Sequence, residues 1–367
     1  MQFDMIDSNL LKFNNKFRKL VVMKHKATFS KHLLDWFYQN KREMPWRETN
    51  DPYKIWLSEV MLQQTQVNTV RSYYTKFIDR FPDIDTLANT PIDEVAKYWE
   101  GLGYYSRVRN FHEAIREVQA NYTSIVPSDP KDFLSLKGVG PYTQGAVMSI
   151  AFNHQLPAVD GNVYRVFARL DNDHFDISST KARKHFEAKV MEVMPNAAGD
   201  FNEALMELGA TVCTPKVPLC MFCPVQNHCM AFEENNVLNL PVKLKKVKKT
   251  VQQYKVLIIQ KDDAIVIEKR PDTGLLASMW QFPMFEMDTH VSDIEEKMNM
   301  SLYIEDAPIV KTKHQFTHLE WQMEVYLAHT KDEIPSKYQL ISIEDKNTYN
   351  FPVSMTKIFD YYIQNNR

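Results

Sequence analysis

Hydrophobic positions recur every three to four residues through most of residues 29–236, which is the period of amphipathic helices. Pro, Gly and Asp interrupt these runs, and no alternating strand pattern occurs before residue 250. The pattern therefore predicts a first domain that is all-α. The expected helices are 53–70, 72–80, 92–99, 106–121, 131–136, 141–151, 162–170, 180–194 and 202–210.

The pattern changes after residue 250, where apolar and polar residues alternate as in half-buried strands. Residues 254–260 and 264–270 flank Asp262-Asp263 and are typical of paired strands. Together with a closing helix, these strands predict a second domain of the α+β class. The other expected elements are strands at 281–286, 314–318 and 321–327 and a helix at 355–364.

A run of lysines marks the boundary between the two domains. We expect an N-terminal extension at 1–28, a helical domain at 29–236, a basic linker at 237–251 and an α+β domain at 252–367. Such a run is typical of a solvated linker, and it also suits a segment that lies along a phosphate backbone. Both interpretations can hold. The lysines are Lys243, Lys245, Lys246, Lys248 and Lys249.

The overall charge does not indicate a nucleic-acid partner. The chain has 367 residues, enough for two domains, with a formal net charge of −2 and a pI of about 6.6. Any DNA-binding site must therefore depend on local charge and on free backbone donors.

The N-terminal segment defines no clear targeting signal. It lacks an apolar run followed by a small-residue cleavage site, and no apolar run in the chain reaches transmembrane length. Its basic residues are mixed with Asp4 and Asp7, so a mitochondrial presequence has weak support. Met23 is an alternative start site. We expect a cytoplasmic protein with no membrane segment.

Two short segments have the composition of functional turns. Gly138-Val139-Gly140 forms a tight glycine turn that opens into a helix at Pro141, and free N–H groups at such a helix start favour an anion. Asp160, twenty positions after Gly140, precedes another expected helix. Taken separately, the glycine turn is typical of a helix–helix connection, and Asp160 is typical of an N-cap.

All four cysteines lie in one short segment. Cys213, Cys220, Cys223 and Cys229 have the spacing C-x6-C-x2-C-x5-C. Clustered cysteines in a chain with no export signal favour a metal site over disulfides. The spacing is not that of the common ferredoxins. A structural zinc site is the general alternative, although such sites usually have two short C-x2-4-C pairs and this chain has one.

The glycine turn and Asp160 together resemble the helix-hairpin-helix DNA glycosylases, in which a glycine hairpin binds DNA phosphate and an aspartate faces the reacting sugar. Within that superfamily, the chain resembles the adenine DNA glycosylase (MutY) family over residues 29 to about 365. The resemblance implies that the cysteines hold a [4Fe–4S] cluster of structural role and that Lys216 contacts the DNA backbone. The matching motifs are 58–67 (SEVMLQQTQV), 138–143, 159–163 and the cysteine segment.

Glu59 and Asp160 are the two carboxyl groups that the resemblance implies for catalysis. From its surroundings in the sequence, Glu59 lies either on the narrow polar stripe of an apolar helix or in a cleft where its pKa is raised. The resemblance makes it the general acid/base that protonates N7 of adenine. An ionised Asp160 would stabilise oxocarbenium character at the sugar, as in glycoside hydrolysis. Neither group reaches a stacked base, so adenine must be flipped out of the duplex.

Tyr142 occupies the position at which related bifunctional glycosylases carry a lysine that forms a Schiff base. A tyrosine cannot form one, so the resemblance implies a monofunctional enzyme that releases the base and largely stops there. Tyr142 is expected to position Asp160 or the sugar, and a core aromatic residue is the alternative. Asn162 is expected to assist Asp160.

Further matches lie around the base and along the duplex, and for each of these side chains ordinary packing is the alternative. An apolar or aromatic wedge compensates for unstacking when a base is extruded. The matches to adenine-pocket residues are Trp46, Arg47 and Glu203. The residues that resemble the wedge are Gln64, Thr65, Leu102 and Tyr104. The expected backbone contacts are Gly138, Val139 and Gly140.

The second domain resembles the Nudix-like recognition domain of the same family. It lacks the acidic R-E-x-x-E-E cluster with which Nudix hydrolases hold metal, because Met-Phe-Glu-Met-Asp follows Pro283. Pyrophosphate hydrolysis is therefore not expected. Phe316, Thr317 and His318 resemble an F-S-H loop that contacts 8-oxoguanine opposite the adenine, with Thr in place of Ser. A strand end is the alternative for these three residues.

The sequence therefore predicts a monomeric, monofunctional adenine DNA glycosylase for duplex DNA containing A:8-oxoguanine or A:G mispairs. The expected fold is an all-α helix-hairpin-helix glycosylase domain with an iron–sulfur loop, followed by an α+β Nudix-like domain. One rival is a thymine or oxidised-pyrimidine glycosylase/lyase, against which Tyr142 and the second domain argue. Another is a catalytically silent iron–sulfur protein that binds DNA or senses redox state, against which the presence of both Glu59 and Asp160 argues.

Overall fold

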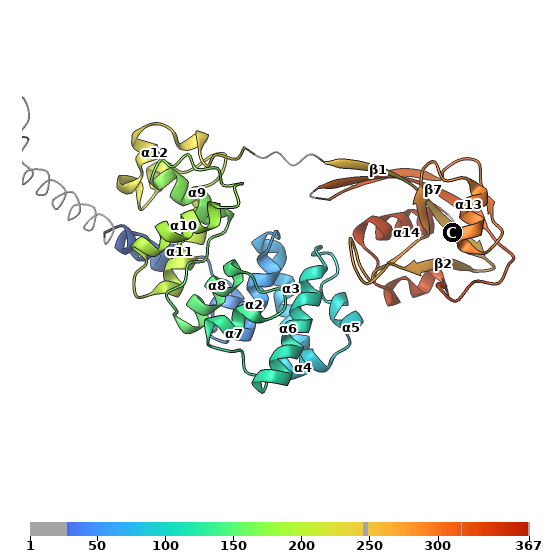
Figure 1. The fold of residues 1–367 in the computed structure, drawn as a ribbon, viewed down its shortest axis with the longest axis horizontal. Coiled ribbons are helices and arrows are strands. Elements are labelled where there is room, and N and C mark those ends of the chain that lie inside the picture. Colours follow the sequence, from blue (N-terminus) through green and yellow to red (C-terminus); the bar gives the residue numbers. More distant parts are fainter. Residues whose placement is uncertain (1–27, 245–248, 317, 366–367) are drawn as a thin grey trace, which may run out of the picture. The chain divides into compact units, whose positions relative to one another are not determined.

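The computed structural model describes residues 28–244, 249–316 and 318–365, which form two units (Figure 1). One unit contains the residues up to Ala88 and Glu113–Lys245, and the other contains Asn89–His112 and Lys246–Arg367. The grouping of Asn89–His112 with the second unit is not predicted by the sequence. The expected extension at 1–28 lies outside the described residues except for Thr28, as does Met23.

Helices build the first unit, as the sequence predicts. Three of them begin at Asp51, Asp129 and Asp160, N-caps whose side chains accept backbone N–H groups. In the part of the chain that the structure describes, none of the helices has the length and apolar character needed to cross a membrane. After a helix at 28–40, the order is α2 (Pro52–Leu62), α3 (Val67–Arg80), α4 (Ile84–Asn89), α5 (Ile92–Lys97, in the second unit), α6 (Ser106–Tyr122, shared by both units), α7 (Pro130–Ser135), α8 (Pro141–Phe152), α9 (Gly161–Leu170), α10 (Ala182–Val193), α11 (Ala198–Thr211) and α12 (Met230–Glu233).

The single helix predicted at 53–70 is two helices. α2 ends at Leu62 and α3 begins at Val67. Gln64, between them, has a φ of +60°, in the left-handed region that a residue other than glycine seldom adopts. The prediction is wrong here because no glycine or proline marks the break and helix-forming residues continue across it.

The packing of four helices gathers the candidate catalytic residues. α8 packs against α2 and α11, and α11 also packs against α9. The approach of α11 to α9 requires Gly209, because a Cβ there would lie 2.5 Å from the Cβ of Asn162. The start of α8, the start of α9 and one face of α11 therefore meet near the middle of α2.

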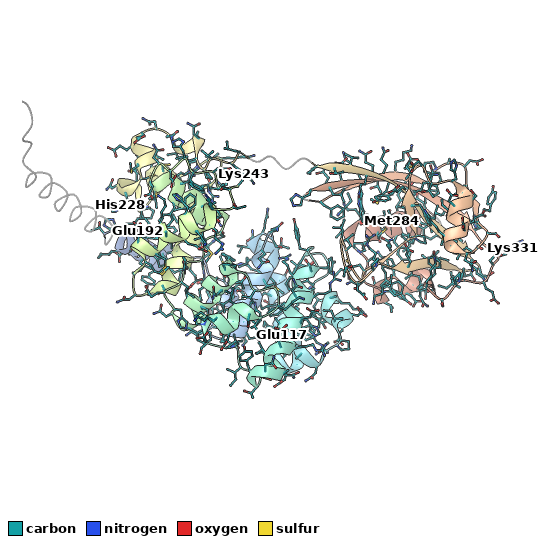
Figure 2. The ribbon with its side chains drawn as sticks, viewed as in Figure 1. Glu117, Glu192, His228, Lys243, Met284 and Lys331 are labelled. Carbon is teal, nitrogen blue, oxygen red and sulfur yellow. The ribbon has the colours of Figure 1, made fainter. Side chains whose placement is uncertain are left out.

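A mixed sheet of eight strands dominates the described part of the second unit (Figure 1). β1 and β2 form the predicted hairpin around Asp262, whose φ is +50°. β1 also pairs in parallel with β7 along most of its length. The strands are β1 (Thr250–Lys261), β2 (Ala264–Lys269), β3 (Trp280–Gln281), β4 (Met284–Glu286, with Met284 labelled in Figure 2), β5 (Tyr303–Ile304), β6 (Val310–Gln315), β7 (Leu319–His329) and β8 (Tyr338–Ile341).

Each face of this sheet packs against a different helix, which confirms the α+β class. Val256 and Ile258 of β1 pack with α14 (Val353–Asn365), whereas Leu257 and Ile259 pack with α13 (Val291–Met298). The sequence predicts α14 but not α13, β5 or β8, because these three elements are short.

The segment predicted as a linker begins inside the first unit. Val237–Asn239 forms a 3-10 turn, and Leu240 is buried in the helical core. Val242 O accepts the N–H of Ile177 at 3.0 Å. Lys243 follows (labelled in Figure 2), and Lys245, Lys246 and Lys248 lie outside the described residues. Leu244 N–H also donates to Oδ1 of Asp176 at 3.1 Å, so the described first unit extends at least to Leu244 and overlaps the expected linker.

Candidate active site

Glu59 lies on a helix that is buried on nearly all sides. Its side chain is only 5% exposed, which excludes the polar-stripe interpretation. Burial raises the pKa of Glu59 to about 7; nearby Glu203 adds to this effect, and Tyr142 opposes it. Glu59 therefore stays largely protonated below neutral pH and is about half protonated at pH 7, as suits a general acid. The other buried residues of α2 are Tyr53, Ile55, Trp56, Leu57, Ser58, Val60 and Met61.

Tyr142, in the first turn of α8, donates a hydrogen bond to this carboxyl group. Its Oη lies 2.7 Å from Oε2 of Glu59 and 3.3 Å from Sδ of Met206 on α11. Burial raises the pKa of Tyr142 well above its ordinary value, so the hydroxyl stays protonated and remains a donor. The hydroxyl contacts Glu59 because the start of α8 packs on α2. The expected role of Tyr142, to position Asp160 or the sugar, stays a prediction.

Asp160 is both the N-cap of α9 and the second carboxyl group near Glu59. Its Oδ1 accepts the backbone N–H groups of Asn162 and Val163, each at 2.8 Å, and its Oδ2 accepts Nδ2 of Asn162 at 2.7 Å. Burial raises the pKa of Asp160, and these hydrogen bonds oppose the rise. The N-cap and the site interpretations are compatible, because capping fixes the carboxylate in one orientation.

Arg165 extends this hydrogen-bonded arrangement, and sequence reasoning missed it. Its Nη2 donates to Oδ1 of Asn162 and to Gly209 O, both at 2.8 Å, and its Nε donates to Cys213 O at 2.7 Å. Arg165 is 8% exposed. A row of hydrogen bonds therefore runs from Cys213 through Arg165 and Asn162 to Asp160. The available signal was the spacing of three between Asn162 and Arg165, which places them on one helix face.

Near Glu59, two arginines and two glutamates form an ion-paired network that includes Arg47 and Glu203. Arg47 Nε donates to Oε1 of Glu203 at 2.7 Å, and Arg47 Nη2 donates to Oε2 of Glu207 at 3.0 Å. Arg42 Nε binds the other oxygen of Glu207 at 2.5 Å. The structure thus brings Arg47 and Glu203 together as the resemblance implies. It adds Arg42 and Glu207, for which the sequence gives no sign.

Trp46 lies next to Arg47 in a 3-10 turn, Pro45–Arg47. It is buried, and its ring packs edge-to-face on Tyr74 with 5.3 Å between centroids. Trp46 therefore anchors the loop that carries Arg47.

The glycine turn has the geometry of an anion site at a helix start. Gly138 has a φ of +73°, and Val139 N–H donates to Leu136 O at 3.1 Å. Gly140 is the N-cap of α8, and in the described residues no side chain caps this helix. The backbone Lys137 N–H binds the carboxylate of Glu117 (labelled in Figure 2) at 3.2 Å, which fixes the turn. The first N–H groups of α8 are thus suited to a phosphate.

The expected wedge residues differ in their exposure. Gln64 is exposed and Thr65 is half-buried in the first unit. In the second unit, Tyr104 is 46% exposed with a φ of +49°, whereas Leu102 is 6% exposed. Leu102 therefore packs into the core of the second unit in this conformation, whereas Tyr104 projects from its surface. The wedge roles stay predictions.

The four cysteines line one recess in the first unit. None of the four is in a disulfide, and the recess, of about 30 Å³, is also lined by apolar side chains and by Arg169. Arg169 is 1% exposed and donates to Sγ of Cys213 at 3.3 Å and to Thr214 O at 2.8 Å. Burial raises the pKa of Cys223 to about 12, and its cysteine neighbours add to the rise.

The four cysteines fit a metal cofactor in residue type and number. In the described residues, no three metal-ligating side chains are already arranged closely enough to hold a metal ion. Four thiols around one recess can supply four thiolates, and a buried guanidinium beside them compensates negative charge. Thiolate sets of this kind hold iron–sulfur clusters or zinc.

The loop expected to contact the lesion joins β6 to β7 in the second unit. Phe316 N–H donates to Leu319 O at 2.7 Å, and its ring packs on Trp321 with 4.9 Å between centroids. His318 is exposed, and Thr317 lies outside the described residues. The strand predicted at 314–318 therefore ends at Gln315, and Phe316 anchors a turn beside the exposed His318.

In the first unit, Glu59, which is largely protonated below neutral pH, lies near Asp160, which accepts three hydrogen bonds. Glu59 can donate a proton to a leaving group, and an ionised Asp160 can stabilise positive charge that develops nearby. Two carboxyl groups in different environments are the usual device for cleaving a glycosidic bond.

Family models define the class of protein. Residues 57–194 match the model described as HhH-GPD superfamily base excision DNA repair protein, and residues 255–361 match the NUDIX domain model. An adenine DNA glycosylase from Rattus norvegicus is 32% identical over 93% of this chain and 79% of its own length. One from Buchnera aphidicola subsp. Schizaphis graminum is 31% identical over 91% of this chain and 98% of its own length. This chain belongs to the adenine DNA glycosylase family.

Solved structures agree with the fold of the helical part. A thermostable thymine-DNA glycosylase is 31% identical, with a TM-score of 0.53, over 57% of this chain and 98% of that one. A trapped endonuclease III–DNA covalent intermediate is 21% identical, with a TM-score of 0.50, and shows the shared fold. The match to the thymine enzyme covers 57% of this chain, whereas the match to the rat adenine enzyme covers 93% of it. The comparison thus favours the adenine enzymes over the pyrimidine-glycosylase rival.

Proposed function

We propose that this glycosylase removes adenine paired with 8-oxoguanine or guanine in duplex DNA and releases the base without cleaving the strand. The observation that carries the proposal is the buried Glu59, which is hydrogen-bonded by Tyr142 and lies near Asp160. The class of reaction follows from the family. The mispair and the residue roles are our proposals.

Each carboxyl group has a separate role in the proposed reaction. Glu59 gives its proton to N7 of the flipped adenine, so the bond between C1′ and N9 breaks with its electron pair going to a neutral leaving base. The sugar becomes oxocarbenium-like, and the Asp160 carboxylate stabilises it. Water then adds to C1′ and loses a proton to Glu59, which restores the acid. Asn162 and Arg165 keep Asp160 oriented.

Tyr142 makes the enzyme monofunctional in this proposal. Its hydroxyl stays protonated and is occupied by Glu59, and it has no amine with which to form a Schiff base. Tyr142 therefore cannot form the covalent Schiff-base intermediate through which a lysine would cleave the strand by β-elimination.

The duplex is proposed to bind a single copy of the chain through the glycine turn. The N–H groups at Gly140 and the start of α8 would bind a phosphate, and Lys216 would contact the backbone. Gln64, Thr65 and Tyr104 are the proposed wedge. Gln64 and Tyr104 hold left-handed φ angles and are exposed, which is typical of strained functional positions.

The cysteine recess is proposed to hold a [4Fe–4S] cluster in a structural role. The cluster would cross-link the segment between Cys213 and Cys229 and so stabilise its fold. We expect anaerobically purified protein to contain iron and to absorb visible light. Metal analysis that finds stoichiometric zinc instead would contradict the assignment.

The second unit is proposed to recognise the lesion through Phe316, Thr317 and His318. 8-Oxoguanine differs from guanine at position 8 and at N7, which becomes a donor, and base-edge contacts of this kind are worth roughly 1–3 kcal/mol. A chain ending at Leu244 keeps Val242 packed against the helical core. We expect it to lose about one to two powers of ten of preference for A:8-oxoguanine over A:G. Equal discrimination by the full and shortened chains would place recognition in the first unit.

The decisive experiment is a single-turnover assay of base release with enzyme in excess. The duplexes carry A:8-oxoguanine, A:G, A:T and T:G. We expect adenine release from the first two and no thymine release. Release of thymine from T:G would support the pyrimidine-glycosylase rival, and the absence of release from every duplex would support the catalytically silent DNA-binding protein.

A further inference from the structure

Glu207 is a buried carboxylate whose two oxygens are fully used within the protein. Its side chain is 1% exposed. Oε1 accepts the backbone N–H of Arg42 at 3.3 Å and its Nε at 2.5 Å. Oε2 accepts Nη2 of Arg42 and Nη2 of Arg47, both at 3.0 Å. These partners lower the pKa of Glu207 even though burial raises it. Glu207 is therefore an anion whose oxygens are not available to bind a substrate.

Arg47 is held from three sides by this arrangement. Its Nε donates to Glu203, its Nη2 to Glu207 and its Nη1 to Arg42 O at 3.0 Å. The guanidinium also lies 5.3 Å from the centre of the Phe37 ring. A side chain fixed in this way cannot turn towards a different partner without losing charged hydrogen bonds.

The orientation of Arg47 decides which part of Glu203 remains available. Only Oε1 of Glu203 accepts from Arg47, and in the described residues Oε2 has no hydrogen-bond partner. Burial raises the pKa of Glu203, and its charge raises the pKa of Glu59, so the two carboxyl groups are close. Glu203 and Glu207 are four residues apart on one face of α11.

We infer that Glu207, together with Arg42, is a positioning residue for recognition of the base. It holds Arg47 so that Arg47 binds a single oxygen of Glu203 and leaves the other oxygen free to accept the 6-amino group of a flipped adenine. This inference rests on the proposed function and deepens it, because it names what keeps the pocket selective for an aminopurine. Neither Glu207 nor Arg42 needs to touch the base.

The consequence of removing the charge of Glu207 follows from the geometry. With Gln at this position, Arg47 loses its second carboxylate and turns both of its arms onto Glu203. A two-pronged pair of this kind occupies both oxygens. The pocket would then lack the acceptor for the 6-amino group. Unsubstituted purine, which has no such group, would not be affected in the same way.

The test compares adenine with unsubstituted purine opposite the same base in single-turnover release. A site built to bind an amino group discriminates against an analogue that lacks it. For Glu207→Gln, we expect the ratio of the adenine rate to the purine rate to fall by about ten- to a hundredfold, the value of one hydrogen bond to a charged group. A general loss of structure would lower both rates and leave the ratio unchanged.

Two further variants keep the test decisive. Arg42→Gln removes most of the support of Glu207 at a side chain that is 37% exposed, and it should give part of the same fall in the ratio even if Glu207→Gln does not fold. Asp173→Asn is the matched control, because Asp173 is a partly buried carboxylate in another ion-paired group, with Lys189 at 3.1 Å and His185 at 2.6 Å. It should leave the ratio unchanged.

An unchanged ratio in both Glu207→Gln and Arg42→Gln would overturn the inference, as would an equal fall in Asp173→Asn. If only Arg42→Gln is folded, its ratio alone decides. Failure of the proposed function is a separate result, since the wild-type chain would then release no adenine and no ratio would exist.

Discussion

Replacement of Tyr142 by Phe should move the pH dependence of base release to higher pH. The change removes the hydroxyl that donates to Glu59 at 2.7 Å and keeps the ring. That hydrogen bond favours the ionised carboxylate and so lowers the pKa of Glu59. Without it, the pKa must rise.

The size of the shift follows from the contact. A hydrogen bond to a charged group contributes roughly 1.5–3 kcal/mol. One pKa unit corresponds to about 1.4 kcal/mol. Because the hydroxyl also contacts the protonated carboxyl group, we take the lower end and expect a rise of about one unit above the wild-type value of about 7.

The sign of the pH effect is set by the role of Glu59 as an acid. Release needs protonated Glu59, so the wild-type rate should fall tenfold for each pH unit above about 7. Protonation of Asp160, whose pKa burial also raises, should cause a separate fall at acidic pH. In Tyr142→Phe the fall above neutral pH should begin about one unit higher. The pH–rate profiles of the two proteins should therefore differ most between neutral and alkaline pH. This difference does not depend on any change in the maximum rate.

The assay is single-turnover adenine release across the pH range in which the duplex stays intact. Tyr53→Phe is the matched control, because Tyr53 lies on the same helix and its buried hydroxyl donates to Phe81 O at 2.8 Å. It should lower stability without moving the profile. A profile of Tyr142→Phe that stays in place or moves to lower pH would refute the assignment of Glu59 as the acid held by Tyr142.

Other substitutions test the same site. Glu59→Gln should abolish adenine release and leave duplex binding nearly intact. The pKa of Glu59 is raised from 4.5 to about 7 in the folded protein, so the wild type loses stability as pH rises through this range. Glu59→Gln, which cannot ionise, should therefore be more stable than the wild type at pH 7 by roughly 3 kcal/mol. Equal free energies of unfolding for the two proteins at pH 7 would contradict this. Tyr142→Lys should gain some strand cleavage, detected by borohydride trapping, whereas efficient trapping of the wild type would contradict a monofunctional enzyme. Arg165→Met should slow release and, if the cysteines hold the proposed cluster, speed its loss. A change in neither would show that the hydrogen bonds from Cys213 through Arg165 to Asp160 do not couple the two sites.

The sequence predicts the elements that carry strong local signals. α8 and α9 are found to within a residue or two, because proline after a glycine turn and aspartate at an N-cap mark their starts. The break between α2 and α3 is missed because Gln64 turns with no glycine. The short β5 and β8 exist only because longer strands pair with them, and such tertiary support leaves no pattern in the chain.

The site is predicted unevenly for a related reason. Glu59 and Asp160 follow from motifs, but burial of Glu59 depends on helices that lie far away in the sequence. Arg42 and Glu207 are 165 positions apart, and nothing local indicates that they meet. Burial of Leu102 and exposure of Tyr104 are likewise not evident from the motif, because a motif match does not show which side of a loop faces the core.

The carboxyl groups of the site divide into two kinds by their surroundings. Burial raises the pKa of Glu59, Asp160 and Glu203, so each of these destabilises the fold when it ionises. Glu207 alone has a lowered pKa, because two arginines supply four hydrogen bonds to it. α11 therefore carries one carboxylate that stabilises the protein and, one turn earlier, another that is left with a free oxygen. A site in which all four were equally well paired would be more stable, but it would have neither an acid for N7 nor an acceptor for the amino group.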